Sequence, residues 1–457
     1  MKRLLDVLLI AAPSPSPLAV ISNRVTSYPP LGICSIATYL KIHNYVAEIC
    51  DLQLEHNNIG TIIDIINIKK PRIIGISTTT ESYQCGLRIA KLCKETDDSI
   101  IIVMGGAHVT FEYNDALKNS FVDIISLREG EETLKELCDF YIGKSITSLY
   151  EIRGIVYRDG NKVMKTKNRA FITNLDEIPF PERKFVEINK YRTPGTISSS
   201  RGCPGRCIFC AAGAMGGGRY RSRSAQSVVD EIDYLTKLGI NYFHFVDDTV
   251  TADVERLELL INEFTKKKNK DNNFQWACES RVDIVTKDLM KWLKKSGCVS
   301  IQFGVESGSQ TMLNSMRKGI SLEQIRKAFS LAAEAEIPTS CCFIIGNPDD
   351  TRTTTEESIA FAEELSSIGA YIVYSISTPY PGTYMFNHAD ELGLEIFDKN
   401  WDHYTTYTSV MNTKHLTTQE IQTYFFDAST SKSINCSESH KKRTEYIRKS
   451  IFNVKGE

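Results

Sequence analysis

The sequence predicts an α/β protein, in which a doubly wound parallel sheet is followed by a partial (β/α)6 barrel and a small helical C-terminal region. Two observations predict this fold. Apolar, β-branched segments of strand length alternate with helical segments over residues 1–150, and the alternation resumes at residue 191 and continues to about residue 385. Polar or Gly-rich stretches follow the strands, at the sheet edge where both architectures bind their ligands.

The alternation divides the chain into four segments: a sheet domain over residues 1–150, a hairpin and linker over 151–190, the barrel over 191–385, and a cap or solvated tail over 386–457. The strands expected in the sheet domain are Leu5–Ala11, Val46–Ile49, Ile73–Ser77, Ile100–Met104 and Val122–Ile125. The strands expected in the barrel are one that ends near Ser200, then Tyr242–Val246, Gln275–Cys278, Val299–Phe303, Ser340–Ile345 and Tyr371–Ser375. Six such units indicate an open barrel, because a closed barrel of this kind has eight.

Size and composition indicate a soluble globular protein of two or three domains. The chain has 457 residues, of which 42% are hydrophobic and 24% are charged. The net charge of −2 gives no reason to expect nucleic acid or an anionic membrane as a partner. Thirteen cysteines, an odd number that lies mostly in apolar segments, favour a reducing cytoplasm over a disulfide framework.

The N-terminal segment Met1–Pro13 superficially resembles a short signal peptide, but Asp6 interrupts its apolar run. A buried first strand is therefore the favoured interpretation. No uninterrupted apolar stretch approaches the ~20 residues of a spanning helix, so we expect no integral membrane segment.

Three cysteines, Cys203, Cys207 and Cys210, follow a predicted strand at C-x3-C-x2-C spacing, with Gly and Pro between them. A short loop of this kind brings several thiolates together, as metal or iron–sulfur ligation requires. Three ligands are one short of the four that close a structural zinc site or saturate a [4Fe–4S] cluster, so one iron would stay open. The alternative is a zinc site with a distant fourth ligand, although no second C-x2-C or C-x2-H lies nearby.

The cysteine segment resembles the cluster loop of the radical S-adenosylmethionine (SAM) enzymes. The resemblance implies that the amino and carboxylate groups of SAM chelate the open iron of a [4Fe–4S] cluster. An electron from an external reductant then cleaves SAM, and a 5′-deoxyadenosyl radical abstracts a hydrogen atom from the substrate. This chemistry would need low oxygen.

The polar residues that end the predicted barrel strands are candidates for holding SAM. In the family, these positions hold the amino group (Asp247 and Asp248), the ribose (Glu306 and Ser307) and the adenine side (Gly346), while Arg281 is suited to pair with the carboxylate. For each residue the alternative is a helix cap or a residue that orders a loop. For Tyr374 and Tyr380 two roles remain open: each side chain faces the substrate or packs within the protein.

Three motifs in the sheet domain, in this order, resemble the cobalamin-binding domain that is fused to one class of radical SAM enzymes. They are P-P-L-G with Pro30, Leu31 and Gly32, G-G-x-H-x-T with Gly105, Gly106 and His108, and E-G-E-E with Glu129 and Gly130. The alternative is a domain that keeps the fold but has lost the cofactor. A dinucleotide site is weakly indicated, because no G-x-G-x-x-G follows the first strand.

The D-x-H-x-x-G motif, whose His ligates cobalt in many cobalamin proteins, is absent from the sequence. The resemblance therefore implies that Thr80 or Glu81, in the loop after the third strand, faces cobalt, and that His108 orders its own loop. Spectroscopy that showed His-ligated cobalt would reject this hypothesis.

These resemblances predict a cobalamin-dependent radical SAM enzyme that methylates an unactivated carbon through methylcobalamin. Two alternatives remain: a radical rearrangement, ring closure or oxidation without methyl transfer, and a non-catalytic iron–sulfur carrier. The sequence does not identify the substrate, which is expected to be a small molecule or a peptide.

Overall fold

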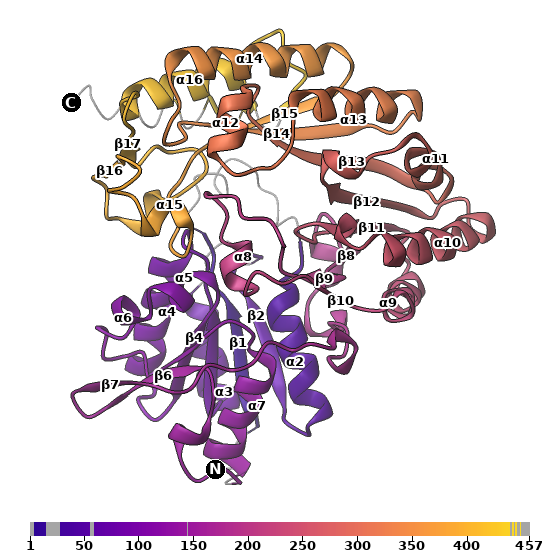
Figure 1. Cartoon of the computed structure of the whole chain (residues 1–457). Coiled ribbons are helices and arrows are strands. Elements are labelled where there is room, and N and C mark those ends of the chain that lie inside the picture. Colours follow the sequence, from indigo (N-terminus) through magenta and orange to yellow (C-terminus); the bar gives the residue numbers. More distant parts are fainter. Residues whose placement is uncertain are drawn as a thin grey trace. The chain divides into compact units, whose positions relative to one another are not determined.

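The computed structural model describes residues 4–14, 28–54, 59–143 and 145–438, together with Lys441, Lys442, Thr444, Glu445 and Arg448. The chain divides into two compact units, Met1–Pro194 and Gly195–Glu457 (Figure 1). None of the described helices combines the length and apolar character that crossing a membrane would require.

The first unit contains a seven-stranded sheet with the strand order β2-β1-β3-β4-β5-β6-β7. Its parallel strands are β1 (Val7–Ala11), β2 (Ala47–Asp51), β3 (Ile73–Ser77), β4 (Ile101–Gly105) and β5 (Ile124–Ser126). The five strands expected from the sequence are therefore present, and the order β2-β1-β3-β4-β5 is that of a doubly wound sheet.

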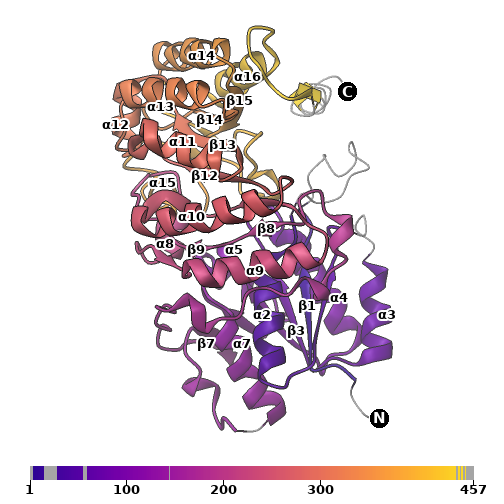
Figure 2. The ribbon, with the colours of Figure 1, turned by 90° about the vertical axis from the view of Figure 1, so that its right-hand side faces the viewer.

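Helices cover both faces of this sheet, with α2 and α7 on one face and α3 and α4 on the other (Figure 2). The helices of the unit are α2 (Leu31–Ile42), α3 (Gly60–Lys69), α4 (Tyr83–Thr96), α5 (Ala107–Phe111), α6 (Tyr113–Ala116) and α7 (Glu131–Cys138), which continues as a π turn over Asp139–Gly143. Successive residues of β3 face opposite layers: Gly75 lies below Leu134 of α7, and Ile76 lies against Gly86 of α4. This explains why the strand is apolar at nearly every position.

The segment that we expected to be a linker belongs to the first unit. Its hairpin, β6 (Ile155–Asp159) and β7 (Lys162–Lys165), extends the sheet antiparallel to β5. Farther along, the backbone N–H of Glu182 donates to Thr38 Oγ1 of α2 at 3.0 Å. The hairpin itself was expected; its pairing with β5 depends on tertiary structure.

The second unit is built on a six-stranded parallel sheet with the order β15-β14-β13-β12-β11-β8, whose two edge strands do not pair. The strands are β8 (Thr196–Ile197), β11 (Tyr242–Phe245), β12 (Gln275–Ser280), β13 (Cys298–Glu306), β14 (Thr339–Ile345) and β15 (Tyr371–Ile376). The helices that follow them on the outside are α9 (Ala225–Lys237), α10 (Val254–Lys270), α11 (Lys287–Lys295), α13 (Leu322–Glu334) and α14 (Arg352–Ser367) (Figure 2). The open six-stranded barrel is thereby confirmed.

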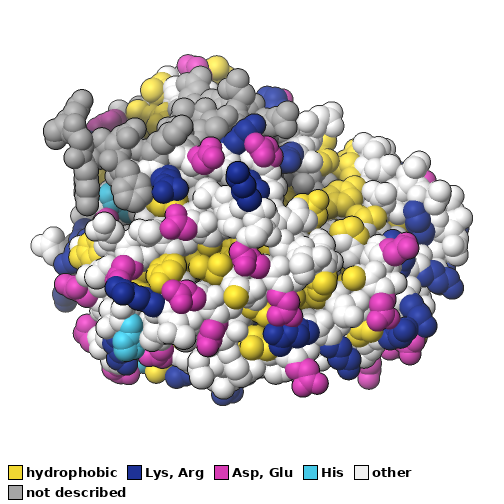
Figure 3. All heavy atoms as spheres, turned by 90° about the horizontal axis from the view of Figure 1, so that it is seen from above, with side chains coloured by type: hydrophobic (Ala, Val, Ile, Leu, Met, Phe, Trp, Pro, Cys, Tyr) yellow, Lys and Arg dark blue, Asp and Glu magenta, His cyan; other side chains and the backbone are white. Residues whose placement is uncertain are grey.

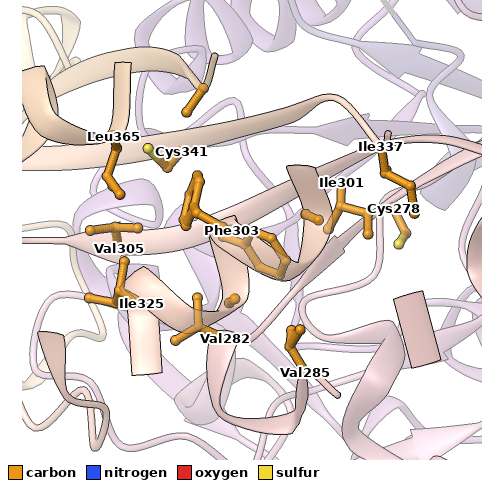
Figure 4. Close-up of a cluster of buried hydrophobic side chains, with 14 of the residues drawn as sticks. Cys278, Val282, Val285, Ile301, Phe303, Val305, Ile325, Ile337, Cys341 and Leu365 are labelled. Carbon is orange, nitrogen blue, oxygen red and sulfur yellow. The ribbon is translucent and has the colours of Figure 1, made fainter. Parts of the chain in front are cut away.

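Alternate residues of the barrel strands enter the core between sheet and helices. On β13, Ile301, Phe303 and Val305 are buried in one cluster with Ile325 of α13 (Figure 4). The residues between them, such as Gln302, are partly exposed on the other face. That concave face is where barrel enzymes place their chemistry.

Between Leu416 and Ile434, the C-terminal segment packs into the barrel core and is not a solvated tail. Helix α16 (Thr418–Thr430) buries Ile421, Phe425 and Phe426 in the same cluster as the barrel strands. Before it lie α15 (Tyr384–Asn387) and a short hairpin of β16 (Glu395–Ile396) and β17 (Met411–Asn412).

On the outer surface, Lys and Arg side chains are interspersed with Asp and Glu (Figure 3), in keeping with the low net charge.

Candidate active site

The three cysteines lie in a loop between β9 (Ser200–Arg201), which pairs with β10 (Arg221–Ser222), and the short helix α8 (Ala212–Met215). Backbone N–H groups point at two of the sulfurs. Gly205 donates to Cys203 Sγ and Ala212 donates to Cys210 Sγ, both at 3.4 Å. Such contacts stabilise thiolates, because they place positive dipoles against a negative sulfur.

The loop lies against the carboxyl ends of the barrel strands. Cys203 Sγ is 3.6 Å from Thr249 Oγ1, just beyond β11. Burial raises the pKa of the Cys207 thiol, and the nearby positive charges of Lys318 and Arg281 oppose that rise. The thiol is thus held close to charged groups from two other strand ends.

The donor set fits an iron–sulfur cluster. Within the described part of the chain, no three His, Cys, Asp or Glu side chains converge as the ligands of one metal ion do. Cysteines that hold a cluster bind different irons and need not converge on one point. Cys203, Cys207 and Cys210 would therefore hold three irons and leave the fourth open.

The two neighbouring aspartates beyond β11 have different environments. Asp247 is buried and accepts hydrogen bonds from Ser199 N at 2.9 Å, from Ser199 Oγ at 3.0 Å and from Ser200 Oγ. Burial raises the pKa of its carboxyl. Asp248 is exposed, and its carboxylate makes no hydrogen bond or ion pair within the described residues. Asp247 thus orders the strand that leads into the cysteine loop, and Asp248 is available for a ligand.

Glu306, at the end of β13, forms a buried ion pair on the concave face. Its Oε1 is 2.6 Å from Lys318 Nζ, and the two side chains are 10% and 11% exposed. Both groups lie over Gly304. The backbone of Glu306 has φ +71°, a left-handed conformation that is unfavourable for a non-glycine residue and is often found at functional sites.

Ser307 and Gly346 face away from the concave side. Ser307 Oγ is 2.8 Å from Ser358 Oγ of α14. Gly346 has φ +84°, and a Cβ there would lie 2.7 Å from Ile421 of α16. The close backbone approach at Gly346 is therefore made to α16 of the same chain.

Arg281, beyond β12, is held in place by its own chain. Its Nε and one Nη atom donate to the two carboxylate oxygens of Asp283, each at 3.0 Å, and the same Nη donates to the carbonyl of Lys318 at 3.2 Å. The other Nη makes no hydrogen bond among the described residues. That nitrogen remains available to a carboxylate.

Glu279 is a site residue that the sequence interpretation did not select. Trp276 and Cys278 of β12 are buried in the core, so Glu279 lies on the concave face, where it is partly exposed. Burial, together with the negative charges of Asp248, Asp247 and Glu306, raises its pKa to about 7. No described residue gives it a hydrogen bond or an ion pair. Strand alternation in Gln275–Ser280 could have indicated it.

In the first unit, the glycine pair after β4 serves the chain itself. Gly106 has φ +110°, and a Cβ there would lie 2.1 Å from the carbonyl oxygen of Thr78. At Gly105 the nearest atom to such a Cβ is 3.7 Å away. The close approach at Gly106 is to the loop after β3, where only a glycine has room.

His108 joins the same two loops. It is buried, its Nδ1 lies 3.2 Å from Thr80 Oγ1, and its ring centroid is 4.0 Å from that of Tyr83. Burial lowers its pKa to about 4, so the ring is neutral at physiological pH. Glu81 accepts a hydrogen bond from Ser14 Oγ, beyond β1, at 3.1 Å.

The remaining motif residues lie at the same edge of the sheet. Pro30, Leu31 and Gly32 begin α2, and Gly32 is exposed, with no atom of the described residues within 4 Å of where its Cβ would be. Glu129 accepts from Ile172 N at 2.9 Å. A Cβ at Gly130 would lie 2.9 Å from Ile36 Cδ1. Among the described residues, the start of α2 is thus the least enclosed of these motif positions.

Comparison with known proteins gives a match for each of the two units. The radical SAM superfamily model matches residues 197–362, and the B12-binding domain model matches residues 17–138. An uncharacterized methyltransferase of Pyrococcus horikoshii is 32% identical over 428 residues, which are 92% of this chain and 90% of that protein. The chain therefore belongs to the radical SAM enzymes that carry a B12-binding domain.

Two further relatives show how far the similarity extends. The anaerobic magnesium-protoporphyrin IX monomethyl ester cyclase of Rubrivivax gelatinosus is 28% identical, over 84% of this chain and 70% of that protein. The radical SAM methyltransferase TsrM of Kitasatospora setae, solved with cobalamin and a [4Fe–4S] cluster, shares the fold. Its TM-score is 0.72 at 16% identity, covering 94% of this chain and 88% of that one.

Proposed function

We propose that this protein is a cobalamin-dependent radical SAM methyltransferase that acts on an unactivated carbon. One observation carries the proposal. The same chain contains a three-cysteine loop, which faces the ends of the barrel strands, and a B12-binding sheet domain. The similarity to a methyltransferase over nearly the whole chain favours methyl transfer. When bound, the cluster and SAM supply a deoxyadenosyl radical and methylcobalamin supplies the methyl group.

The barrel residues divide into ligand-binding and positioning roles. Asp248 would hold the SAM ammonium, the remaining Nη of Arg281 its carboxylate, and Glu306 a ribose hydroxyl, because these groups lie at strand ends near the thiols. Asp247, Ser307 and Gly346, which the family resemblance also implies, would act by positioning: their contacts are all to the chain itself.

The first unit would hold cobalamin at the carboxyl edge of its parallel strands. Gly32 gives backbone access there, and the Gly106, His108 and Glu129 contacts fix the surrounding loops. Thr80 or Glu81 would lie nearest cobalt, since both follow β3 and no D-x-H-x-x-G histidine exists. The substrate would be a small molecule, the electron donor an external one-electron reductant, and the compartment a reducing, low-oxygen cytoplasm.

Methyl-labelled SAM tests the proposal even before the substrate is identified. Reconstituted, reduced protein loaded with cobalamin should form labelled methylcobalamin and, once substrate is present, 5′-deoxyadenosine and labelled product. Deoxyadenosine formed without any labelled methylcobalamin would favour the second candidate, a radical ring closure, to which the similarity with the Rubrivivax cyclase points. Reduced protein that leaves SAM intact would reject both and leave an iron–sulfur carrier.

A further inference from the structure

The first unit contains a cavity whose lining residues do not all belong to any one of the motifs named above. Its volume is about 260 Å³, smaller than the pockets of ~300–1,000 Å³ that enclose whole ligands. Its walls are the end of α5, the start of α6, the loop after β5, and the chain that returns from the β6–β7 hairpin. The cavity therefore suits one chemical group of a ligand.

Two cations in the wall have no anionic partner among the described residues. The guanidinium carbon of Arg128 lies 4.8 Å from the ring centroid of Phe171, and Lys165 Nζ lies 4.6 Å from that of Tyr113. Neither side chain makes a hydrogen bond or an ion pair within the part of the chain that the structure describes. Stacking on an aromatic face holds a cation while leaving its N–H groups able to donate.

The other charged residues of the wall are already engaged. Arg169 is paired with Glu132 at 2.8 Å and also with Glu136. Glu129, the acidic residue of the wall, accepts from Ile172 N. Arg128 and Lys165 are therefore the cations of the wall whose side chains make no hydrogen bond or ion pair among the described residues, and the Glu129 carboxylate offsets part of their charge.

The backbone of Arg128 is fixed in an unusual conformation. Its φ is +62°, in the left-handed region, and its N–H donates to Thr110 Oγ1 at 3.0 Å. On the preceding residue, Leu127 N donates to Gly154 O at 2.9 Å. A non-glycine residue keeps such a conformation when its surroundings determine it, and such residues cluster at ligand sites.

We propose that this cavity binds a phosphate group, with Arg128 and Lys165 pairing with its oxygens. A phosphate can accept hydrogen bonds from the N–H groups of both cations, and its oxygens match the donors of a guanidinium. Two sources share this chemistry: the phosphodiester in the nucleotide tail of cobalamin, and a phosphorylated small molecule that binds separately. The first source rests on the cobalamin binding proposed above; the second does not.

Calorimetric titration of the full-length protein with inorganic phosphate tests the site itself. The wild type should bind phosphate saturably, and Arg128→Gln should weaken binding by roughly tenfold or more, because it removes hydrogen bonds between charged groups. Lys165→Gln should weaken it less. Lys162→Gln, which removes an equal charge from the same strand outside the cavity, is the matched control and should leave binding unchanged.

A second titration identifies the source, using cobalamin and cobinamide, which lacks the nucleotide tail and its bridging phosphodiester. If the tail is the source, Arg128→Gln should weaken cobalamin binding but not cobinamide binding, and bound cobalamin should block phosphate. If a separate molecule is the source, cobalamin-loaded protein should still bind phosphate. Phosphate that fails to bind the wild type, or binds Arg128→Gln equally well, would overturn the proposal, whether or not a corrinoid binds.

Discussion

The two units place polar residues at the same kind of edge, the carboxyl ends of parallel strands, but use them differently. In the first unit, the motif residues Gly106, His108 and Glu129 all contact the chain itself. In the second unit, Asp248 and Glu279 have no partner among the described residues and face the side where the cysteine loop lies. A position at a strand end therefore does not by itself make a residue a ligand; the direction of its side chain decides.

The largest effect should come from removing a cluster ligand in the second unit. Cys207→Ala should abolish the cluster and with it all SAM cleavage, because two thiolates cannot hold the cubane. Cobalamin uptake should persist, since the units have separate cores. Iron and sulfide content, deoxyadenosine formation and corrinoid absorption measure these three properties.

Cys436→Ala, which alters a cysteine of the same unit outside the loop, is the control and should keep the cluster. Loss of cobalamin uptake together with the cluster in Cys207→Ala would show that the two units depend on one another.

The next largest effect should come from the buried ion pair. Lys318→Met leaves the Glu306 carboxylate uncompensated and should cost about 3–5 kcal/mol of unfolding free energy, measured by urea denaturation of cluster-free protein. The double variant Lys318→Met/Glu306→Gln should recover most of this loss. A loss below about 1 kcal/mol in the single variant would mean that water reaches Glu306, as at a surface pair.

Because Glu279 ionises less readily in the folded protein, the free energy of unfolding should fall as pH rises. The pKa of Glu279 is raised to about 7 in the folded protein, so near pH 4 the folded state is neutral, the unfolded state is mostly neutral, and the penalty is small. Between the ordinary glutamate pKa and 7 the unfolded state ionises first, so the folded state loses stability until the penalty is complete above pH 7.

Glu279→Gln removes this titration. The variant should match the wild type near pH 4 and exceed its stability by about 3 kcal/mol at pH 8, in urea unfolding without SAM. Glu258→Gln, at an exposed position of α10, should show no such pH dependence. An equal gain at both pH values would contradict the assignment.

The smallest effect should come from the first unit's glycine pair. Gly106→Ala should cost about 1–3 kcal/mol and reduce cobalamin uptake, because its left-handed backbone and the Thr78 carbonyl leave no room for a Cβ. Gly105→Ala should be tolerated. Thermal unfolding and corrinoid absorption compare the two, and equal losses would mean that a ligand, not Thr78, needs the space.

The sequence alone predicted most of the elements, because their signals are local. Apolar runs such as Ile73–Ser77 and Ser340–Ile345 lie within one element, and their bounds agree with the structure to within one residue. The cysteine loop was also recognisable, since its three ligands lie within eight residues. Spacing of this kind can be read before the fold is known.

The errors arose where residues distant in sequence meet. The hairpin at 155–165 joins β5, and α16 fills the barrel core, because apolar faces were available there that no local pattern reveals. The packing of Gly346 below Ile421 follows from the same contact.

The sequence by itself determined the class of fold, the cluster loop and the family, since periodicity, glycine and proline positions and ligand spacing are local properties. Only the tertiary structure decided that Ser199 and Ser200 hold the Asp247 carboxylate, while the Asp248 carboxylate has no partner among the described residues. It also decided that Glu279 lies near the negative charges of other acidic side chains. Successive residues of a strand point to opposite sides, and which side is the core depends on helices supplied from elsewhere in the chain.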